Sequence, residues 1–263
     1  MESKPSDVER QVFQGSDEVT TGLDRRHTWA TTIRSKLDEL IKNSIIGFAD
    51  GLTVPFALTA GLSSIGSSRI VILGGLAELF SGAISMGLGA YLASVTERKH
   101  YDVEREKKHR DVEKCPEVEE ARIYDIFSHY GTGPERARSI VESLQANRGL
   151  YVKFMMDFEL KLERPNRRFA FLAALAMGLS YLLGGLIPMI PYFATPLPKA
   201  LYISIGVAVV TLLIFGYVKA VVTGTTQRDA CWSAVQTLLI GAAAAAVSYG
   251  IVRGVNSAEP GEL

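Results

Sequence analysis

The sequence has few of the residues that build disulfides, cysteine metal clusters or nucleic-acid surfaces. Its 263 residues include two cysteines, Cys115 and Cys231, too few for a disulfide framework and too far apart for a Cys-x-x-Cys motif. Neither sign of charge is in excess, because 28 Lys and Arg residues balance 28 Asp and Glu residues. This balance excludes a nucleic-acid binder that relies on global positive charge, so we expect no nucleic-acid partner.

Charge is nearly absent from two long segments of the chain. Residues 45–94 contain four ionisable side chains, Asp50, Arg69, Glu78 and Tyr91, and residues 169–252 contain four charged residues. A helix of about 20 apolar residues crosses a bilayer. We therefore predict an all-α integral membrane protein in contact with membrane lipid. The five predicted transmembrane helices cover residues 45–65, 70–95, 169–190, 200–218 and 230–252.

The segment between the second and third spans is too long for a hairpin loop and carries its own helix signals. Helical stretches are expected near residues 96–114, 117–130, 135–144 and 150–163, with Pro116 and Pro134 as boundaries. The predicted fold class is thus five spans plus a small cytosolic helical domain inserted between helices 2 and 3. The predicted domains are a largely disordered tail at 1–42, spans at 43–95, the inserted domain at 96–166, spans at 167–252 and a tail at 253–263.

Positive charge predicts the orientation of these parts. Residues 1–42 carry seven Lys and Arg residues and residues 95–168 carry sixteen, whereas the opposite side holds Arg69, Lys199 and Arg253. Cytosolic segments are the ones enriched in positive charge. We expect a cytosolic N-terminus, a cytosolic inserted domain and a luminal C-terminus. The first 30 residues lack the apolar stretch of a signal peptide, and residues 1–25 are typical of a disordered tail.

Two carboxylates lie inside predicted spans, where acidic side chains are rare and usually face a bundle interior or a water-filled path. Asp50 shares a helical stripe of small and polar residues in the first span. Pro55 cannot donate a hydrogen bond to the carbonyl of Gly51, which leaves a backbone oxygen free beside the carboxylate. The alternative is that each acid bonds a neighbouring helix. The favoured interpretation is a cation site.

Glu78 begins a second polar stripe, on which Gly82, Ser85 and Gly89 follow at helical spacing and Met86 lies alongside. A methionine in a membrane helix is commonly only packing, but here it accompanies an acid. Oxygen ligands alone suit Mg²⁺ or Ca²⁺, while a thioether favours transition metals. The residues predict a membrane path for divalent transition-metal ions.

Three motifs give a family resemblance: DGLTVPFALTAGLS at 50–63, GAISMGLGAYLA at 82–93 and FMMDFEL at 154–160. With these motifs in this order over about residues 40–252, the chain resembles the vacuolar iron transporter family. The resemblance implies a homodimer in the vacuolar membrane with the ion path between protomers. It also implies transport of Fe²⁺, often with Mn²⁺, from cytosol to vacuole in exchange for protons, without a prosthetic group.

The resemblance also implies site residues. Asp50, Glu78 and Met86 match the membrane positions for metal and protons. In the inserted domain, Met155, Met156 and Glu159 match metal-binding positions. The family's four helical glutamate positions fall on Lys108, Asp111, Glu119 and Arg122.

Two of those four positions thus carry a positive charge instead of an acid. Nearby acids that could form a shifted site are Glu104, Glu106, Glu113, Glu117 and Glu120. Because a cation beside a metal repels it, we expect the inserted domain to bind transition metals, with Zn²⁺ as a surrogate, less tightly or in smaller number than its relatives do.

Functions other than transport account for fewer of these residues. Glu97-x-x-His100 and Glu106-x-x-His109 are motifs of di-iron enzymes, but they lie nine residues apart on one helix and face roughly opposite directions. We therefore predict that the chain is not an enzyme. A membrane-anchored metal-sensing or signalling protein gives no reason for acids inside the spans. A divalent-metal channel or uniporter without proton coupling remains the main alternative, since it needs the same polar path.

Overall fold

The computed structural model describes the backbone of residues 7–258, with side chains for residue 34 and from residue 36 onward. Every regular element in this range is a helix, which confirms the predicted all-α class. In chain order the helices are α1 (Asp7–Leu62), η1 (Ser63–Ile65), α2 (Ser68–Lys114), α3 (Pro116–His129), α4 (Pro134–Gln145), α5 (Arg148–Phe154), η2 (Met155–Glu159), α6 (Arg167–Ala194), α7 (Lys199–Val222) and α8 (Gln227–Ala258).

Five of these helices are long and apolar enough to cross a membrane, as predicted. The candidate spans are Lys36–Ile65, Ser68–Lys114, Arg167–Ala194, Lys199–Val222 and Gln227–Ala258. The chain divides into two compact units. We call residues 1–87 with 172–263 the bundle, and residues 88–171 the inserted unit.

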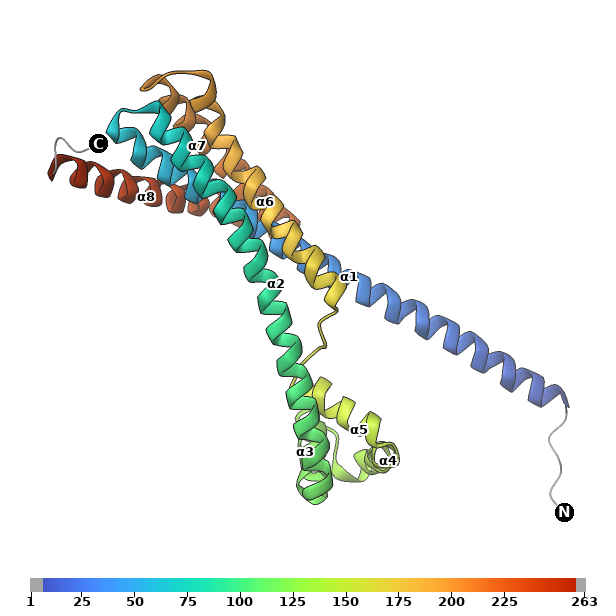
Figure 1. Ribbon diagram of the computed structural model, residues 1–263. Helices are drawn as coiled ribbons and strands as arrows, with labels where there is room; N and C mark the ends of the chain where they lie inside the picture. The colour runs from blue at the N-terminus through green and yellow to red at the C-terminus, as the bar shows by residue number, and fades with distance from the viewer. Residues whose placement is uncertain (1–6, 259–263) are drawn as a thin grey trace, which may run out of the picture. The chain divides into compact units, whose positions relative to one another are not determined.

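Small residues let the helices of the bundle approach closely. Helix α8 packs along both α1 and α7 (Figure 1). Where α1 meets α6, a methyl group added at Gly51 would lie 2.1 Å from the carbonyl oxygen of Tyr181. Where α2 meets α6, one added at Gly178 would lie 2.8 Å from the carbonyl oxygen of Ala83. Such contacts replace the hydrophobic effect as the source of helix association in lipid.

The inserted unit is built around a small apolar core. Pro116 and Pro134 stand in the first turns of α3 and α4, where a missing N–H costs nothing. Asn147 caps α5 by accepting hydrogen bonds from the backbone N–H groups of Gly149 and Leu150. The buried core residues come from α3, α4, α5 and η2: Ile123, Ala137, Val141, Tyr151 and Met155.

Three features differ from the sequence expectation. Helix α1 extends back to Asp7, in the segment for which a disordered tail was expected. Residues 1–6 of that tail, and residues 259–263 of the expected luminal tail, lie outside the described residues. No proline interrupts residues 7–54, so a nucleated helix can propagate through them. The second span and the following charged stretch form one unbroken helix, α2. The fourth expected helix of the insert changes to a π-helical turn at Met155.

Candidate metal sites

Glu78 on α2 is held by Tyr181 on α6. The Tyr181 hydroxyl donates a hydrogen bond to one Glu78 carboxylate oxygen at 2.6 Å. The other carboxylate oxygen is buried and has no hydrogen-bond partner among the described residues. One oxygen of this carboxylate is therefore held by Tyr181, and the other is buried in an apolar bundle without a partner. The second oxygen can bind a cation or a proton, either of which would offset the cost of its burial.

The polar stripe on α2 makes room for this contact. A methyl group added at Gly82 would lie 2.5 Å from the Tyr181 hydroxyl oxygen, so only glycine lets the ring reach Glu78. Tyr181 belongs to a buried cluster with Leu79, Ala83 and Met189, and the half-buried Met86 packs against it. Glu78 and Met86 therefore share one neighbourhood. Sequence reasoning missed Tyr181, although a buried tyrosine hydroxyl in a span needs a polar partner.

Asp50 on α1 is exposed on the surface of the single chain. The adjacent Gly51 carbonyl, which Pro55 frees, faces α6: a methyl group added at Gly185 would lie 3.0 Å from the Gly51 oxygen and 2.8 Å from the Pro55 ring. The carbonyl is thus covered by a glycine of α6. The carboxylate of Asp50 remains open to an ion or to a second protomer.

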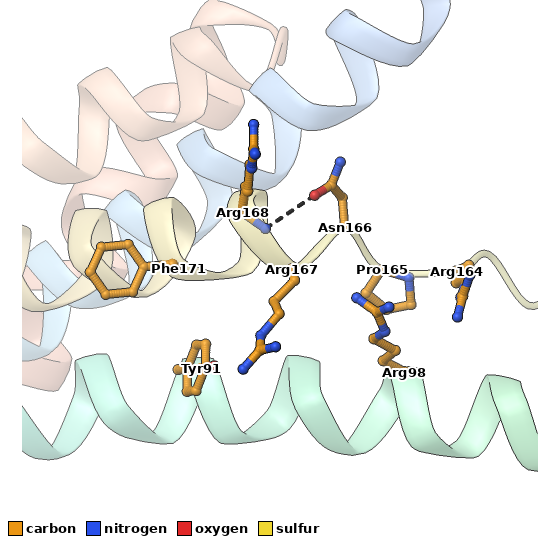
Figure 2. A pocket seen from close by; sticks show the side chains of 8 residues that line it. All are labelled: Tyr91, Arg98, Arg164, Pro165, Asn166, Arg167, Arg168 and Phe171. Atoms are coloured by element: carbon orange, nitrogen blue, oxygen red, sulfur yellow. Dashed lines mark hydrogen bonds between the residues drawn. The ribbon is translucent and has the colours of Figure 1, made fainter.

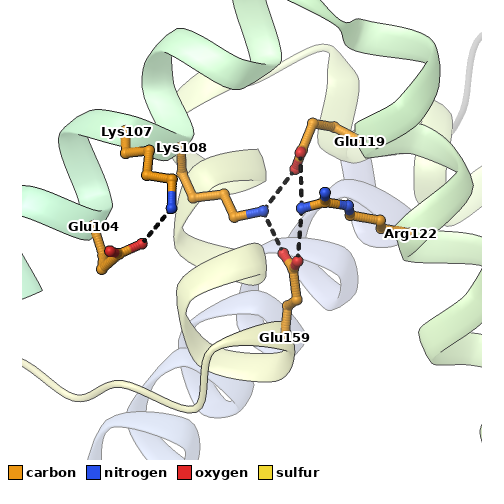
Figure 3. A network of polar contacts seen from close by, with 6 residues as sticks. All are labelled: Glu104, Lys107, Lys108, Glu119, Arg122 and Glu159. Atoms are coloured by element: carbon orange, nitrogen blue, oxygen red, sulfur yellow. Dashed lines mark hydrogen bonds and ion pairs between the residues drawn. The ribbon is translucent and has the colours of Figure 1, made fainter.

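In the inserted unit, two carboxylates and two cations form a closed ring (Figure 3). Lys108 Nζ on α2 lies 3.0 Å from Glu119 on α3 and 2.7 Å from Glu159 on η2. Arg122 on α3 lies 3.1 Å from Glu119 and 2.9 Å from Glu159. The side chains of Lys108 and Glu119 are only 4% and 3% exposed. The ring is formally neutral, so the buried charges are compensated without a metal ion.

The two methionines of the third motif are fully buried. Met155 belongs to the apolar core and Met156 is equally shielded from solvent. Both lie in the same π-helical turn as Glu159. Burial, together with the nearby negative charges of Glu119 and other acids, raises the pKa of Tyr151 to about 12. The two methionines thus share one turn with Glu159, and Lys108 and Arg122 join Glu159 to Glu119.

The other acids named from the sequence are spread over the surface. Glu104 pairs with Lys107 at 3.5 Å, and Glu113 pairs with Arg148. Among the described residues, the side chains of Asp111 and Glu117 make no ion pair or hydrogen bond, and Glu120 is half-buried beside Tyr151. In the described part of the chain, no group of three His, Cys, Asp or Glu side chains is arranged to hold a metal.

The two Glu-x-x-His motifs lie on the single helix α2, as expected. His100 is exposed and His109 is half-buried. The backbone carbonyl of His109 accepts a hydrogen bond from Arg148 at 2.8 Å. A di-iron centre needs motifs from different helices, and this arrangement within one chain does not supply them.

Comparison with known proteins gives a consistent family assignment. Residues 41–253 match the model of the VIT family. The chain is 45% identical over 221 residues to a "Vacuolar iron transporter" of Centaurea cyanus, covering 83% of this chain and 89% of that protein. It is 36% identical over 263 residues to a vacuolar iron transporter of Arthroderma benhamiae, covering 96% and 94%. These relatives are named as transporters, which agrees with the prediction that the chain is not an enzyme.

Proposed function

Because this chain belongs to the VIT family, we propose that it transports Fe²⁺ from the cytosol across the vacuolar membrane into the lumen. The observation that carries the proposal is the surroundings of Glu78, an acid in an apolar span. One of its carboxylate oxygens accepts a hydrogen bond from Tyr181, and the other is buried without a partner among the described residues. A carboxylate in such a place has no evident structural use for its free oxygen. An ion in transit supplies the missing partner.

The proposed path consists of Asp50, Glu78 and Met86. One chain offers few ligands here, while transition metals take four to six. We infer a homodimer in which the exposed Asp50 of each protomer faces the ion path, so that the symmetric pair doubles the ligand set. The mixed oxygen and sulfur donors suit Fe²⁺ and Mn²⁺ better than Mg²⁺.

Proton exchange follows from the same carboxylate. A metal ion and a proton compete for the free oxygen of Glu78, because each neutralises its charge. An acidic lumen would protonate this oxygen and release the metal, and metal arriving from the cytosol would displace the proton. Transport in exchange for protons is therefore the mode that we propose, with a channel or uniporter as the alternative.

The inserted unit is proposed to be cytosolic, as the distribution of positive charge indicates. Glu119, Glu159, Met155 and Met156 supply suitable donors for a transition metal. A metal at this place has to displace Lys108 and Arg122 from both carboxylates. We therefore propose a site in the inserted unit that is weakened by its internal cations, and a transport path that does not depend on that site.

The proposal is tested by Fe²⁺ uptake into vesicles that contain the purified full-length protein. Asp50→Asn keeps the shape of the side chain but removes the charge that offsets the lost hydration of a divalent ion, so uptake should fall to near background. Asp38→Asn, an exposed aspartate on the same helix, should leave uptake unchanged. Full uptake by Asp50→Asn would contradict a direct role of this residue.

A further inference from the structure

A wide pocket of about 920 Å³ lies within the inserted unit (Figure 2). Four arginines and two aromatic residues dominate its lining: Arg98, Arg164, Arg167, Arg168, Tyr91 and Phe171. No acidic residue lines it among the described residues. The iron path and the charge ring described above use none of these side chains, so the pocket needs its own explanation.

The four arginines of this pocket are not equally free to bind an anion. Arg164 forms an ion pair with Asp102 at 3.1 Å. Arg98, Arg167 and Arg168 have no ion-pair partner among the described residues, and Arg98 is half-buried. Figure 2 shows Arg167 extending toward α2, where Tyr91 and Arg98 lie, whereas Arg168 points the other way. The usable positive charge of the pocket is therefore concentrated at Arg98 and Arg167.

These two arginines reach the pocket from different elements, Arg98 from α2 and Arg167 from the start of α6. Tyr91 and Arg98 are seven residues apart on α2, which places them on the same face of the helix. Arg167 is the first residue of α6, and Asn166 precedes it. The Asn166 side chain accepts a hydrogen bond from the backbone N–H of Arg168 at 3.1 Å. The N-terminal dipole of this 28-residue helix adds to the attraction for an anion.

The pocket also stands at the boundary between apolar and charged sequence. The apolar run of the second span ends at residue 95 and that of the third begins at residue 169. Tyr91 and Phe171 lie just inside these limits and the arginines just outside them. Aromatic side chains inside and cations outside are the pattern of a membrane–water interface. The pocket is then at the level of the lipid headgroups.

We propose that this pocket binds the phosphorylated headgroup of an anionic membrane lipid, with Arg98 and Arg167 as the phosphate ligands. The planar guanidinium group offers paired donors that match phosphate oxygens. Tyr91 and Phe171 provide apolar surface for the adjoining glycerol and acyl chains, which a soluble phosphate compound lacks. Anionic lipids are concentrated in the cytosolic leaflet, the side on which the positive charge of this chain places the pocket.

The test measures binding to the purified full-length protein in uncharged detergent. The probes are dioctanoyl phosphatidylinositol 4-phosphate, its deacylated form glycerophosphoinositol 4-phosphate, and dioctanoyl phosphatidylcholine. The acylated anionic lipid should bind more tightly than either of the others. For Arg98→Gln with Arg167→Gln, its affinity should fall about tenfold or more, because charge-assisted contacts are lost. Arg105→Gln with Arg136→Gln, which removes two exposed arginines outside the pocket, should bind like the wild type.

Equal binding of the deacylated compound would overturn the lipid assignment in favour of a soluble phosphorylated ligand. Equal binding of phosphatidylcholine, or unchanged affinity in the double variant, would overturn the site itself. If the double variant does not fold, the single variants Arg98→Gln and Arg167→Gln replace it, and unchanged affinity in both would overturn the site. These results do not depend on Fe²⁺ uptake, so the lipid site and the proposed transport can fail separately.

Discussion

At the scale of single residues, Lys108 is the side chain that most affects metal binding by the inserted unit, because it already occupies two of the candidate ligands, Glu119 and Glu159. Its ammonium group contacts two carboxylates and is almost fully buried. Charges removed from water are costly unless they are paired, and removal of one partner from a buried pair costs about 3–5 kcal/mol. In the metal site proposed for the inserted unit, a divalent ion would take the position of Lys108 between Glu119 and Glu159. The cations that neutralise Glu119 and Glu159 are thus side chains of the protein itself.

Charge reversal at the two basic positions tests this account. Lys108→Glu with Arg122→Glu should increase Zn²⁺ affinity of the full-length protein by about tenfold or more, since repulsion becomes attraction. Without metal, the same variant should lose hydrogen-exchange protection in α3–η2, because the buried Glu119 then faces like charges. Titration calorimetry and hydrogen exchange measure the two effects, and bound metal should restore protection.

Lys107→Glu with Arg136→Glu is the matched control. It makes the same change in charge at exposed positions, one of them adjacent to Lys108. It should alter neither metal affinity nor protection by much, because exposed ion pairs contribute little. Unchanged Zn²⁺ affinity in the Lys108 and Arg122 variant would mean that other acids form the site and that the sequence match of α2 and α3 to the family is shifted.

The sequence indicated the candidate site residues but only part of the contacts that the structure gives them. Glu78 stood out because an acid in a long apolar run is easy to recognise. Its partner Tyr181 did not, since a tyrosine in a span commonly sits at the interface and shows no periodic signal. The cations at 108 and 122 were expected to repel a metal. Their ion pairs with Glu119 and Glu159 depend on how α2, α3 and η2 pack, which a single sequence does not reveal.

At the scale of elements, hydropathy predicted the five spans because lipid imposes a simple length and composition on a helix. It could not predict that α2 runs unbroken into the charged stretch, since a change in composition does not end a helix without a proline or a cap. The π-helical turn at Met155 was also unexpected. It holds the two methionines and Glu159 in one widened turn, which is common at functional sites.

The crossing of α1 and α6 provides a prediction at this scale. Gly51→Ala should disturb the crossing, because the added methyl group would lie 2.1 Å from the backbone oxygen of Tyr181. We expect Fe²⁺ uptake to fall and stability to drop by about 1–3 kcal/mol, as overpacking does. Gly206→Ala on α7, where an added methyl group meets nothing within 4 Å, is the control and should have neither effect. If Gly51→Ala behaved like Gly206→Ala in uptake and thermal unfolding, α1 and α6 could move apart without loss, and the prediction would be wrong.

At the scale of the whole molecule, the two units have separate proposed tasks. The bundle contains Asp50 and Glu78, the acids of the proposed membrane path, and the inserted unit contains a neutral charge ring and an arginine pocket. Since Asp50 is exposed on the single chain, the proposed homodimer is needed to enclose the path. The family assignment covers both units, because the matched range extends from residue 41 to 253.

Proton-coupled transport is tested by measuring Fe²⁺ uptake into vesicles at neutral outside pH while the lumen is made progressively more acidic. We predict that wild-type uptake rises with luminal acidity, because protonation of Glu78 releases the metal on that side. Glu78→Gln should take up little metal and show no dependence on the gradient, while Glu163→Gln, an exposed acid of the inserted unit, should behave like the wild type. Wild-type uptake that is indifferent to the gradient would contradict proton exchange and identify a channel or uniporter.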